Sequence, residues 1–357
     1  MKKLTLLMCT LALVGISSLF MSCEGPAGPA GANGTNGQNG NATCGVCHSD
    51  NATSVNLKFA QYDLSQHNKG IIYEEEAGRV QCGGCHTGDG FAEAAALGQD
   101  DAVTHATSKI DCRACHTIHK NYDTTDFTLR ITAGFALRQT GVAIDQNKGN
   151  LCAKCHQARS YVRTVPDTVK ASGSGSPYSR FGPHYGVVAN VVTMNGPVQI
   201  TGSTAYPTSN PHASLPKGCV SCHMGSDPAN PAVGGHTFLM PTANLSVMTS
   251  CQTCHDATTI KNAVNAAQNA KDIATYRRLL IDKGMLDTTS AVLSDGTYQV
   301  LGEYFATPGG KTRVFTNPKD VDVVLNYLYI AKDRSRGIHN PKYVQALIKN
   351  GLEYLNQ

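Results

Sequence analysis

Apolar residues recur with helical spacing in the last hundred residues of the chain. The spacing predicts three helices, over about residues 259–283, over 319–332 and from residue 341 onward. The apolar positions are Ala266, Ala270, Ile273 and Leu280 in the first helix, with Gly284 as its stop, Val321, Val324, Leu325 and Leu328 in the second, and Val344, Leu347, Ile348, Leu352 and Leu355 in the third, which Asn340 caps before Pro341. We therefore predict that residues 258–357 form a helical packing module.

The chain begins with two positive charges, Lys2 and Lys3, and an apolar run from Leu4 to Met21. This order is typical of a secretory signal. A transmembrane helix is the alternative, but Gly and Ser residues interrupt the run, and no second apolar span of about 18 residues follows it. The end of the run resembles a bacterial lipobox, in which the signal is cut before a Cys that then carries lipid. The resemblance implies a signal peptide over residues 1–22 and a lipidated Cys23, whose several acyl chains would anchor the exported protein stably to a membrane.

Glycine occupies every third position just after this Cys. The positions are Gly25, Gly28, Gly31, Gly34, Gly37 and Gly40. The period is that of collagen, in which only Gly fits the axis of a triple helix. Because only two prolines support that interpretation and the repeat is short, we favour a flexible spacer over residues 23–43 and keep trimerisation as the alternative.

The middle of the chain shows little periodicity of either kind. Two short apolar runs, Val187–Val192 and Val198–Thr201, predict a hairpin joined by Asn-Gly. Pro197 weakens this prediction, because proline cannot donate a hydrogen bond to a strand ladder. The predicted fold class is therefore mainly α with extensive irregular structure and little β.

One short pattern, Cys-x-x-Cys-His, occurs six times in this middle part. In chain order, motifs 1 to 6 are Cys44–His48, Cys82–His86, Cys112–His116, Cys152–His156, Cys219–His223 and Cys251–His255. Their cysteines are Cys44 and Cys47, Cys82 and Cys85, Cys112 and Cys115, Cys152 and Cys155, Cys219 and Cys222, and Cys251 and Cys254. Twelve of the 14 cysteines thus lie in the motifs. Three motifs fall in a first region, residues 44–140, and three in a second, residues 141–257.

This pattern is the attachment sequence of c-type haem. Two thiols one turn apart add across the two vinyl groups of one porphyrin, and the His that follows lies under the iron as its proximal ligand. Zinc sites and disulfides also use paired cysteines, but neither needs a His after every second Cys. With only 13 His in 357 residues, six coincidences would be very rare. The sequence predicts six covalently attached haem c groups, with proximal ligands His48, His86, His116, His156, His223 and His255.

The composition changes the expected core. The 314 residues after residue 43 leave about 52 for each of six haems, and the chain has no Trp and few other aromatic residues. We therefore expect the porphyrins to supply much of the buried apolar surface, with the chain wrapped around a haem stack. Without haem, the chain is not expected to hold its fold.

Function depends on the sixth ligand of each iron, because an iron with two protein ligands passes electrons whereas an open position binds substrates. Seven histidines lie outside the motifs: His67, His105, His119, His184, His212, His236 and His339. Seven donors are enough for six irons, with at least one to spare or to serve a neighbouring subunit. Met is the other usual ligand, but no Met has a distinctive context here. We therefore expect low-spin, low-potential haems with two His ligands each.

Charge gives no reason to expect nucleic acid as a partner. The 30 Lys and Arg exceed the 26 Asp and Glu by four, and loss of Lys2 and Lys3 with the signal leaves +2. Each ferric haem adds about one positive charge at iron and about two negative propionates, so six haems bring the net charge to about −4. The basic sequence therefore predicts a slightly acidic loaded protein.

Several of the seven histidines lie in segments that resemble distal-ligand segments of bacterial multihaem cytochromes c. The segments are Gly182-Pro183-His184, Gly234-Gly235-His236 and Gly337-Ile338-His339-Asn340-Pro341. In that group, which includes the ammonia-forming nitrite reductases, a His just before a C-terminal helix, here His339, commonly ligates a haem. From about residue 44 to its end, the chain resembles a multihaem cytochrome c lipoprotein of the kind that moves electrons through the periplasm or at the cell surface.

The resemblance implies three hypotheses. The first is an electron carrier, anchored by lipid to the outer membrane at its periplasmic side or at the cell surface, that serves redox partner proteins or an external acceptor. The second is a nitrite or hydroxylamine reductase with one open haem. Ammonia-forming nitrite reductases often carry a Cys-x-x-Cys-Lys site, which is absent here because all six motifs end in His. The third is a haem filament, a homo-oligomer in which one His ligates a neighbouring subunit's iron, and the lipid anchor argues against it.

Overall fold

The computed structural model describes residues 45, 47–49, 53–76, 78–104, 107–160, 182–241, 248–256, 260, 266–288, 304–305, 315 and 317–357. The predicted signal peptide, Cys23, the spacer, Cys44 and His105 lie outside these residues. The described residues all belong to one compact unit, Thr43–Gln357. The division into two three-haem regions and a helical module stays a prediction. No helix in the described ranges has both the length and the apolar character needed to cross a membrane.

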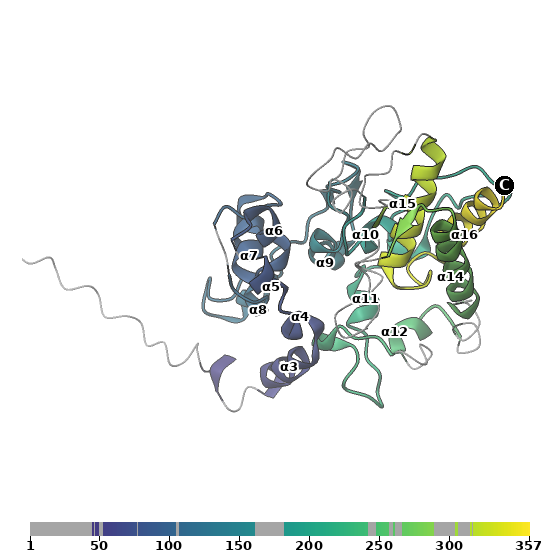
Figure 1. Cartoon of the computed structure of the whole chain (residues 1–357). Helices are drawn as coiled ribbons and strands as arrows, with labels where there is room; N and C mark the ends of the chain where they lie inside the picture. Colours follow the sequence, from purple (N-terminus) through teal and green to yellow (C-terminus); the bar gives the residue numbers. More distant parts are fainter. Residues whose placement is uncertain are drawn as a thin grey trace, which may run out of the picture. The chain divides into compact units, whose positions relative to one another are not determined.

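Helices dominate the described residues, and the strands are very short (Figure 1). The α-helices are α3 (Thr53–Leu64), α4 (Gln66–Lys69), α5 (Ile72–Glu75), α6 (Val80–His86), α7 (Gly88–Leu97), α8 (Cys112–Cys115), α9 (Asn150–Cys155), α10 (Val188–Val192), α11 (Val220–His223), α12 (Thr249–Gln252), α14 (Ala266–Asp282), α15 (Pro318–Asp333) and α16 (Pro341–Leu355). The 3-10 helices are η2 (Thr124–Phe127), η3 (Asn147–Gly149), η5 (Pro211–Ser214) and η6 (Gly235–Thr237). Strands β1 (Phe135–Ala136) and β2 (Ala143–Ile144) pair antiparallel, as do β3 (Leu286–Asp287) and β4 (Tyr304–Phe305), with Phe135 opposite Ile144 and Leu286 opposite Phe305. The predicted class, mainly α with extensive irregular structure and little β, is confirmed.

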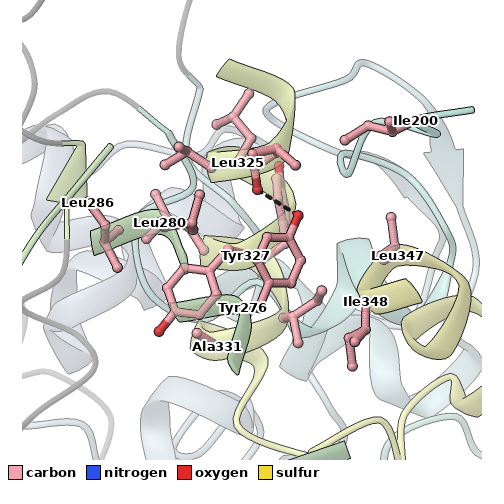
Figure 2. Packing of buried hydrophobic residues seen from close by; sticks show 14 of the residues in the cluster. Ile200, Tyr276, Leu280, Leu286, Leu325, Tyr327, Ala331, Leu347 and Ile348 are labelled. Carbon is pink, nitrogen blue, oxygen red and sulfur yellow. Dashed lines mark hydrogen bonds between the residues drawn. The ribbon is translucent and has the colours of Figure 1, made fainter. Parts of the chain in front are cut away.

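Helix α15 forms the centre of the largest apolar core. Asn317 caps it by accepting a hydrogen bond from the Lys319 backbone N–H at 3.1 Å. From Val321 onward nearly every residue is buried, as in a helix that other elements enclose on all sides. Helices α10, α14 and α16 pack on α15. Figure 2 shows part of this core, in which the rings of Tyr276 and Tyr327 lie 5.8 Å apart.

The second and third helices predicted from periodicity are confirmed, and the first is confirmed over the part that the structure describes. The first is described from Ala266 on, and it ends where Gly284 adopts a left-handed φ of 64° that other residues rarely take. The third begins at Pro341, with the Asn340 side chain accepting a hydrogen bond from the Tyr343 backbone N–H at 3.4 Å. The predicted apolar positions of the second and third helices are buried, apart from Leu352, which is partly buried against the same core.

The predicted hairpin is wrong. Val188–Val192 is the helix α10, because Val187 and Val191, one helical turn apart, both bury their side chains in the core beside α15. The second run forms no strand among the described residues, and its Ile200 backbone N–H donates to the Val198 carbonyl at 3.0 Å. Its backbone is also bonded by a side chain: Asn326 accepts from the Val198 N–H and donates to the Val198 carbonyl, both at 2.7 Å.

Replacing Asn326 with Ala should lower the free energy of unfolding by about 1–3 kcal/mol. The substitution leaves the half-buried backbone N–H of Val198 without its partner, which costs about that much, and leaves the Ile200 N–H as the donor to the Val198 carbonyl. The shift in the urea midpoint at constant slope measures the loss. Asn356→Ala is the control, because Asn356 is exposed and bonds only within its own helix end, to the Leu352 carbonyl. Equal effects of the two substitutions would contradict the role of Asn326.

The residues around motifs 1 to 4 bury few large apolar side chains among themselves. Two small clusters are found there, one around Leu137 and Ile144 and one around Phe91 and Leu151. Among the described residues, the large exposed apolar side chains all lie between Leu57 and Val142. This part therefore lacks the protein core that the C-terminal helices have, as expected if another group fills its interior.

Candidate cofactor-binding site

Each described motif begins as one turn of helix. In motifs 3 to 6 the backbone N–H of the motif His donates to the carbonyl of the first Cys at 2.9–3.0 Å, and in motif 2 the whole sequence lies in α6. Residues three and four positions apart lie on the same helix face. The turn therefore puts both thiols and the following imidazole on one side. The eleven described motif cysteines are free thiols.

These thiols and rings line one continuous cavity of about 3090 Å³. An ordinary small-molecule site measures about 300–1,000 Å³, so the cavity has room for several such ligands. Every described motif Cys and His contributes to its wall, as do apolar residues such as Phe91, Leu129 and Leu151. The cavity thus combines apolar walls with free thiols and imidazoles.

Each motif His faces one His from outside the motifs. The ring-centroid distances are 6.1 Å for His48 and His119, 6.0 Å for His86 and His184, 6.3 Å for His116 and His236, 6.0 Å for His156 and His67, 6.2 Å for His223 and His339, and 6.2 Å for His255 and His212. Six of the seven candidate distal histidines are thus each brought to a different motif. The seventh, His105, lies outside the described residues.

The spacing of the paired rings fits a metal between them. A metal–imidazole bond is about 2 Å long and the nitrogen lies roughly 1.1 Å from its ring centre, so two imidazoles on opposite sides of one metal have centres about 6.2 Å apart. Ordinary aromatic pairs scatter over about 4.5–7 Å. The interplanar angles range from 27° to 83°, as expected of rings free to rotate about a shared metal axis. The donor set therefore fits an iron porphyrin held through two thiols and two imidazoles.

The pairs join segments that are far apart in the chain. The partners of motifs 1 to 5 lie 71, 98, 120, 89 and 116 positions from the motif His, and that of motif 6 lies 43 positions away. In motifs 4 and 6 the partner precedes the motif, and in the other four it follows. The local sequence of a motif therefore says nothing about which His will face it.

Four of the paired rings have a defined partner at Nδ1. The acceptors are the Phe127 carbonyl for His116 at 2.7 Å, the Phe238 carbonyl for His223 at 3.0 Å, the Ile338 carbonyl for His212 at 2.9 Å, and Oδ1 of Asp333 for His339 at 2.7 Å. A carbonyl or carboxylate oxygen only accepts, so Nδ1 carries the proton and Nε2 keeps its lone pair. Metal-bound histidines are usually held in this way.

Burial keeps many of these imidazoles neutral. Burial and, after it, neighbouring histidines lower the pKa of His156 to about 4, although its ring faces the cavity. Burial and then Arg159 lower the pKa of His184 to about 3. Burial also lowers the pKa of His67, His86, His116, His223 and His236. Because neutral imidazole is the form that binds metals, these rings are ready to coordinate at neutral pH.

Neighbouring motifs place their thiols close together. The neighbours are Cys85 with Cys155, Cys152 with Cys219, Cys115 with both thiols of motif 4, and Cys222 with Cys251. Motif 4 is therefore next to motifs 2, 3 and 5, and motif 5 is next to motif 6. Motif 1 reaches the same set through His119, which lies three residues after the His of motif 3. The six sites thus form one connected group.

The loop that carries His119 is built around a buried carboxylate. His119 and Tyr122 both adopt left-handed backbone conformations, with φ of 64° and 61°, which are costly for residues with a Cβ. Asp126 accepts hydrogen bonds from the backbone N–H groups of Asn121 at 2.7 Å and Tyr122 at 3.1 Å. Burial acts to raise the pKa of Asp126, but the backbone donors of residues 119–122 outweigh it and the pKa is lowered. The ionised carboxylate therefore holds the loop in its strained form.

Replacing Asp126 with Ala should release His119 from motif 1. Without the acceptor, the left-handed residues relax, and the imidazole leaves its place 6.1 Å from His48. If each motif holds an iron, as the sequence predicts, the iron of motif 1 should lose its sixth ligand, measured as a new high-spin EPR signal. Asp126→Asn keeps an acceptor oxygen and should give a smaller signal. An unchanged spectrum in Asp126→Ala would show that the loop does not depend on this carboxylate.

Phe238 is a site residue that the sequence did not predict. Its ring lies 5.3 Å from that of His67 and 6.0 Å from that of His236, and its carbonyl accepts from His223. It therefore touches ligand candidates of motifs 3, 4 and 5. The only sequence signal is its position two residues after His236. Asp126 and Asp333 were also not predicted from the sequence, because neither belongs to a motif.

Two solved structures are similar to this chain. The outer cell wall cytochrome OcwA has a TM-score of 0.49 at 18% identity, with 84% of this chain and 50% of OcwA covered. The undecahaem cytochrome from the S-layer of Carboxydothermus ferrireducens has a TM-score of 0.44 at 18% identity, with 81% and 40% covered. The chain thus spans about half the length of the first and two fifths of the second. No family model and no curated protein matches it. Its function is therefore inferred from its own residues.

Proposed function

We propose that this chain is a multihaem c-type cytochrome that carries six haem c groups and transfers electrons. The observation that carries the proposal is the set of six ring pairs, each joining a motif His to a different His from elsewhere in the chain. In each site the two thiols would hold the porphyrin covalently. The two imidazoles would close both axial positions of its iron.

Closed axial positions favour electron transfer over substrate chemistry. The bound group supplies one-electron chemistry at iron, and the protein supplies spacing, burial and ligand orientation. The neighbouring thiols of motifs 2 to 6 support sites packed side by side, which short-range electron exchange requires. No acid, base or nucleophile among the described residues is needed for this function.

We infer the cellular setting from the N-terminal sequence. The signal and the lipobox-like end of the apolar run support export and a lipid on Cys23, with residues 24–43 as a spacer. The outer membrane, at its periplasmic side or the cell surface, is the proposed location. Redox proteins or an external acceptor are the proposed partners, together with a homo-oligomer in which the surplus His105 would ligate a neighbouring subunit's iron.

EPR combined with an optical redox titration of the loaded protein tests the proposal. We expect six low-spin irons and no high-spin signal. We also expect no spectral change when nitrite is added, because no axial position is open. A stoichiometric high-spin iron that binds nitrite would replace the electron carrier with the reductase hypothesis. A haem content below six would instead identify a motif that carries no haem.

A further inference from the structure

Each of the six pairs contains one histidine from outside the motifs. One of these six histidines has a carboxylate as its hydrogen-bond acceptor. Nδ1 of His339 lies 2.7 Å from Oδ1 of Asp333, the last residue of α15. The Asp333 side chain is only 1% exposed. Its second oxygen accepts from the hydroxyl of Ser335. That hydroxyl oxygen in turn accepts from the backbone N–H groups of Gly337 at 3.2 Å and His339 at 3.3 Å, so a short loop holds carboxylate and imidazole together.

The other defined Nδ1 partners are neutral. His116, His212 and His223 each donate to a backbone carbonyl. A charged acceptor makes a stronger hydrogen bond than a neutral one. Burying a carboxylate is costly unless hydrogen bonds and charge compensate for it. Among the four rings with a defined Nδ1 partner, only one therefore donates to a buried carboxylate. This acceptor distinguishes that ring from the other three.

We propose that Asp333 lowers the reduction potential of the iron that His223 and His339 would ligate. The inference rests on the proposed function. The carboxylate draws the Nδ1 proton toward itself, which leaves more electron density on Nε2 and makes the imidazole a stronger donor. A stronger donor stabilises ferric iron more than ferrous iron. Second-shell hydrogen bonding is one of the means by which proteins set haem potentials.

The site whose potential Asp333 lowers lies between two other sites. Thiols of motif 5 lie beside those of motif 4 on one side and motif 6 on the other. Lowering the potential of this site makes it hold an electron less readily than it would with a neutral partner at His339. Asp333 therefore acts on the site that lies between motif 6 and motif 4.

The test is Asp333→Asn, which keeps an acceptor oxygen of the same shape and removes only the charge. We expect six low-spin irons as before, with one potential raised. If Asp333 favours ferric over ferrous binding tenfold, within the usual range for such partners, the shift is about 59 mV for one electron. An EPR-monitored titration separates the haem by its own g values. Asp282→Asn is the matched control, because Asp282 also ends a helix but is 54% exposed, and no potential should move.

A second variant predicts a shift of opposite sign. Ser335→Ala removes a donor from the carboxylate, which becomes a stronger acceptor for His339, so the same potential should fall. Six low-spin irons with no shift in either variant would overturn the proposal and leave the proposed function standing. A high-spin iron in Asp333→Asn would show that Asp333 only positions the ring, which also overturns it. Fewer than six low-spin irons in the unsubstituted protein would instead contradict the proposed function.

Discussion

Protein in which His184 is replaced with Ala is expected to contain one high-spin iron among six. His184 lies 6.0 Å from His86, across the space where motif 2 would hold its iron, so the substitution opens one axial position. The reduced protein should then bind CO at one site. The substitution also removes the link through the iron between His86 and His184, which lie 98 positions apart. Closing a loop of about that length contributes at most about 5 kcal/mol to the free energy of unfolding. The urea midpoint should therefore fall as well.

His105→Ala is the control for this substitution. His105 is the candidate left over when the other six are each assigned to a motif, so its removal should leave six low-spin irons and no CO binding. A high-spin iron in His105→Ala, with an unchanged spectrum in His184→Ala, would mean that the pairing is wrong for motif 2.

Replacing Tyr276 with Ala should destabilise the C-terminal helices by about 3–5 kcal/mol, the usual cost of removing a large buried aromatic side chain. Tyr276 is fully buried between α15 and α16. Its hydroxyl donates to the Val323 carbonyl at 3.0 Å (Figure 2). The ring also packs so closely on Gly351 that a Cβ there would lie 2.1 Å from the hydroxyl oxygen. The urea midpoint of unfolding, compared at constant slope, measures the loss.

Tyr276→Phe separates packing from hydrogen bonding. It keeps the ring and removes only the hydroxyl, so we expect a loss of about 1 kcal/mol. The low-spin haem count should not change in either variant, because Tyr276 contacts no motif. If the two substitutions had equal effects, the hydrogen bond rather than the packed ring would hold the helices together.

Features encoded within a few residues could be predicted from the sequence. The thiols and imidazole of each motif lie within one helical turn, so their shared face follows from spacing alone. The same holds for α15 and α16, whose apolar periodicity and caps are local. The hairpin prediction failed for two reasons. Tertiary packing placed the β-branched run Val187–Val192 in a helix. The Asn326 side chain also accepts the backbone hydrogen bond that a partner strand would have accepted.

The pairing within the site could not be predicted from the sequence. The six paired histidines were all among the seven candidates, but no periodicity connects His184 with motif 2 or His339 with motif 5, since each meets its motif only in the folded chain. The residues that hold the rings, such as Asp126 and Phe238, act through backbone groups and a ring edge. Such contacts leave no mark in residue spacing.

The six ring pairs have a consequence for biogenesis. Their spans are 48–119, 67–156, 86–184, 116–236, 212–255 and 223–339, and each overlaps the next. If the chain emerges from its N-terminus, as the proposed export implies, the site of motif 4 can close before those of motifs 2 and 3, and that of motif 6 before that of motif 5. The order in which the pairs can close therefore differs from the order in which the motifs are synthesised.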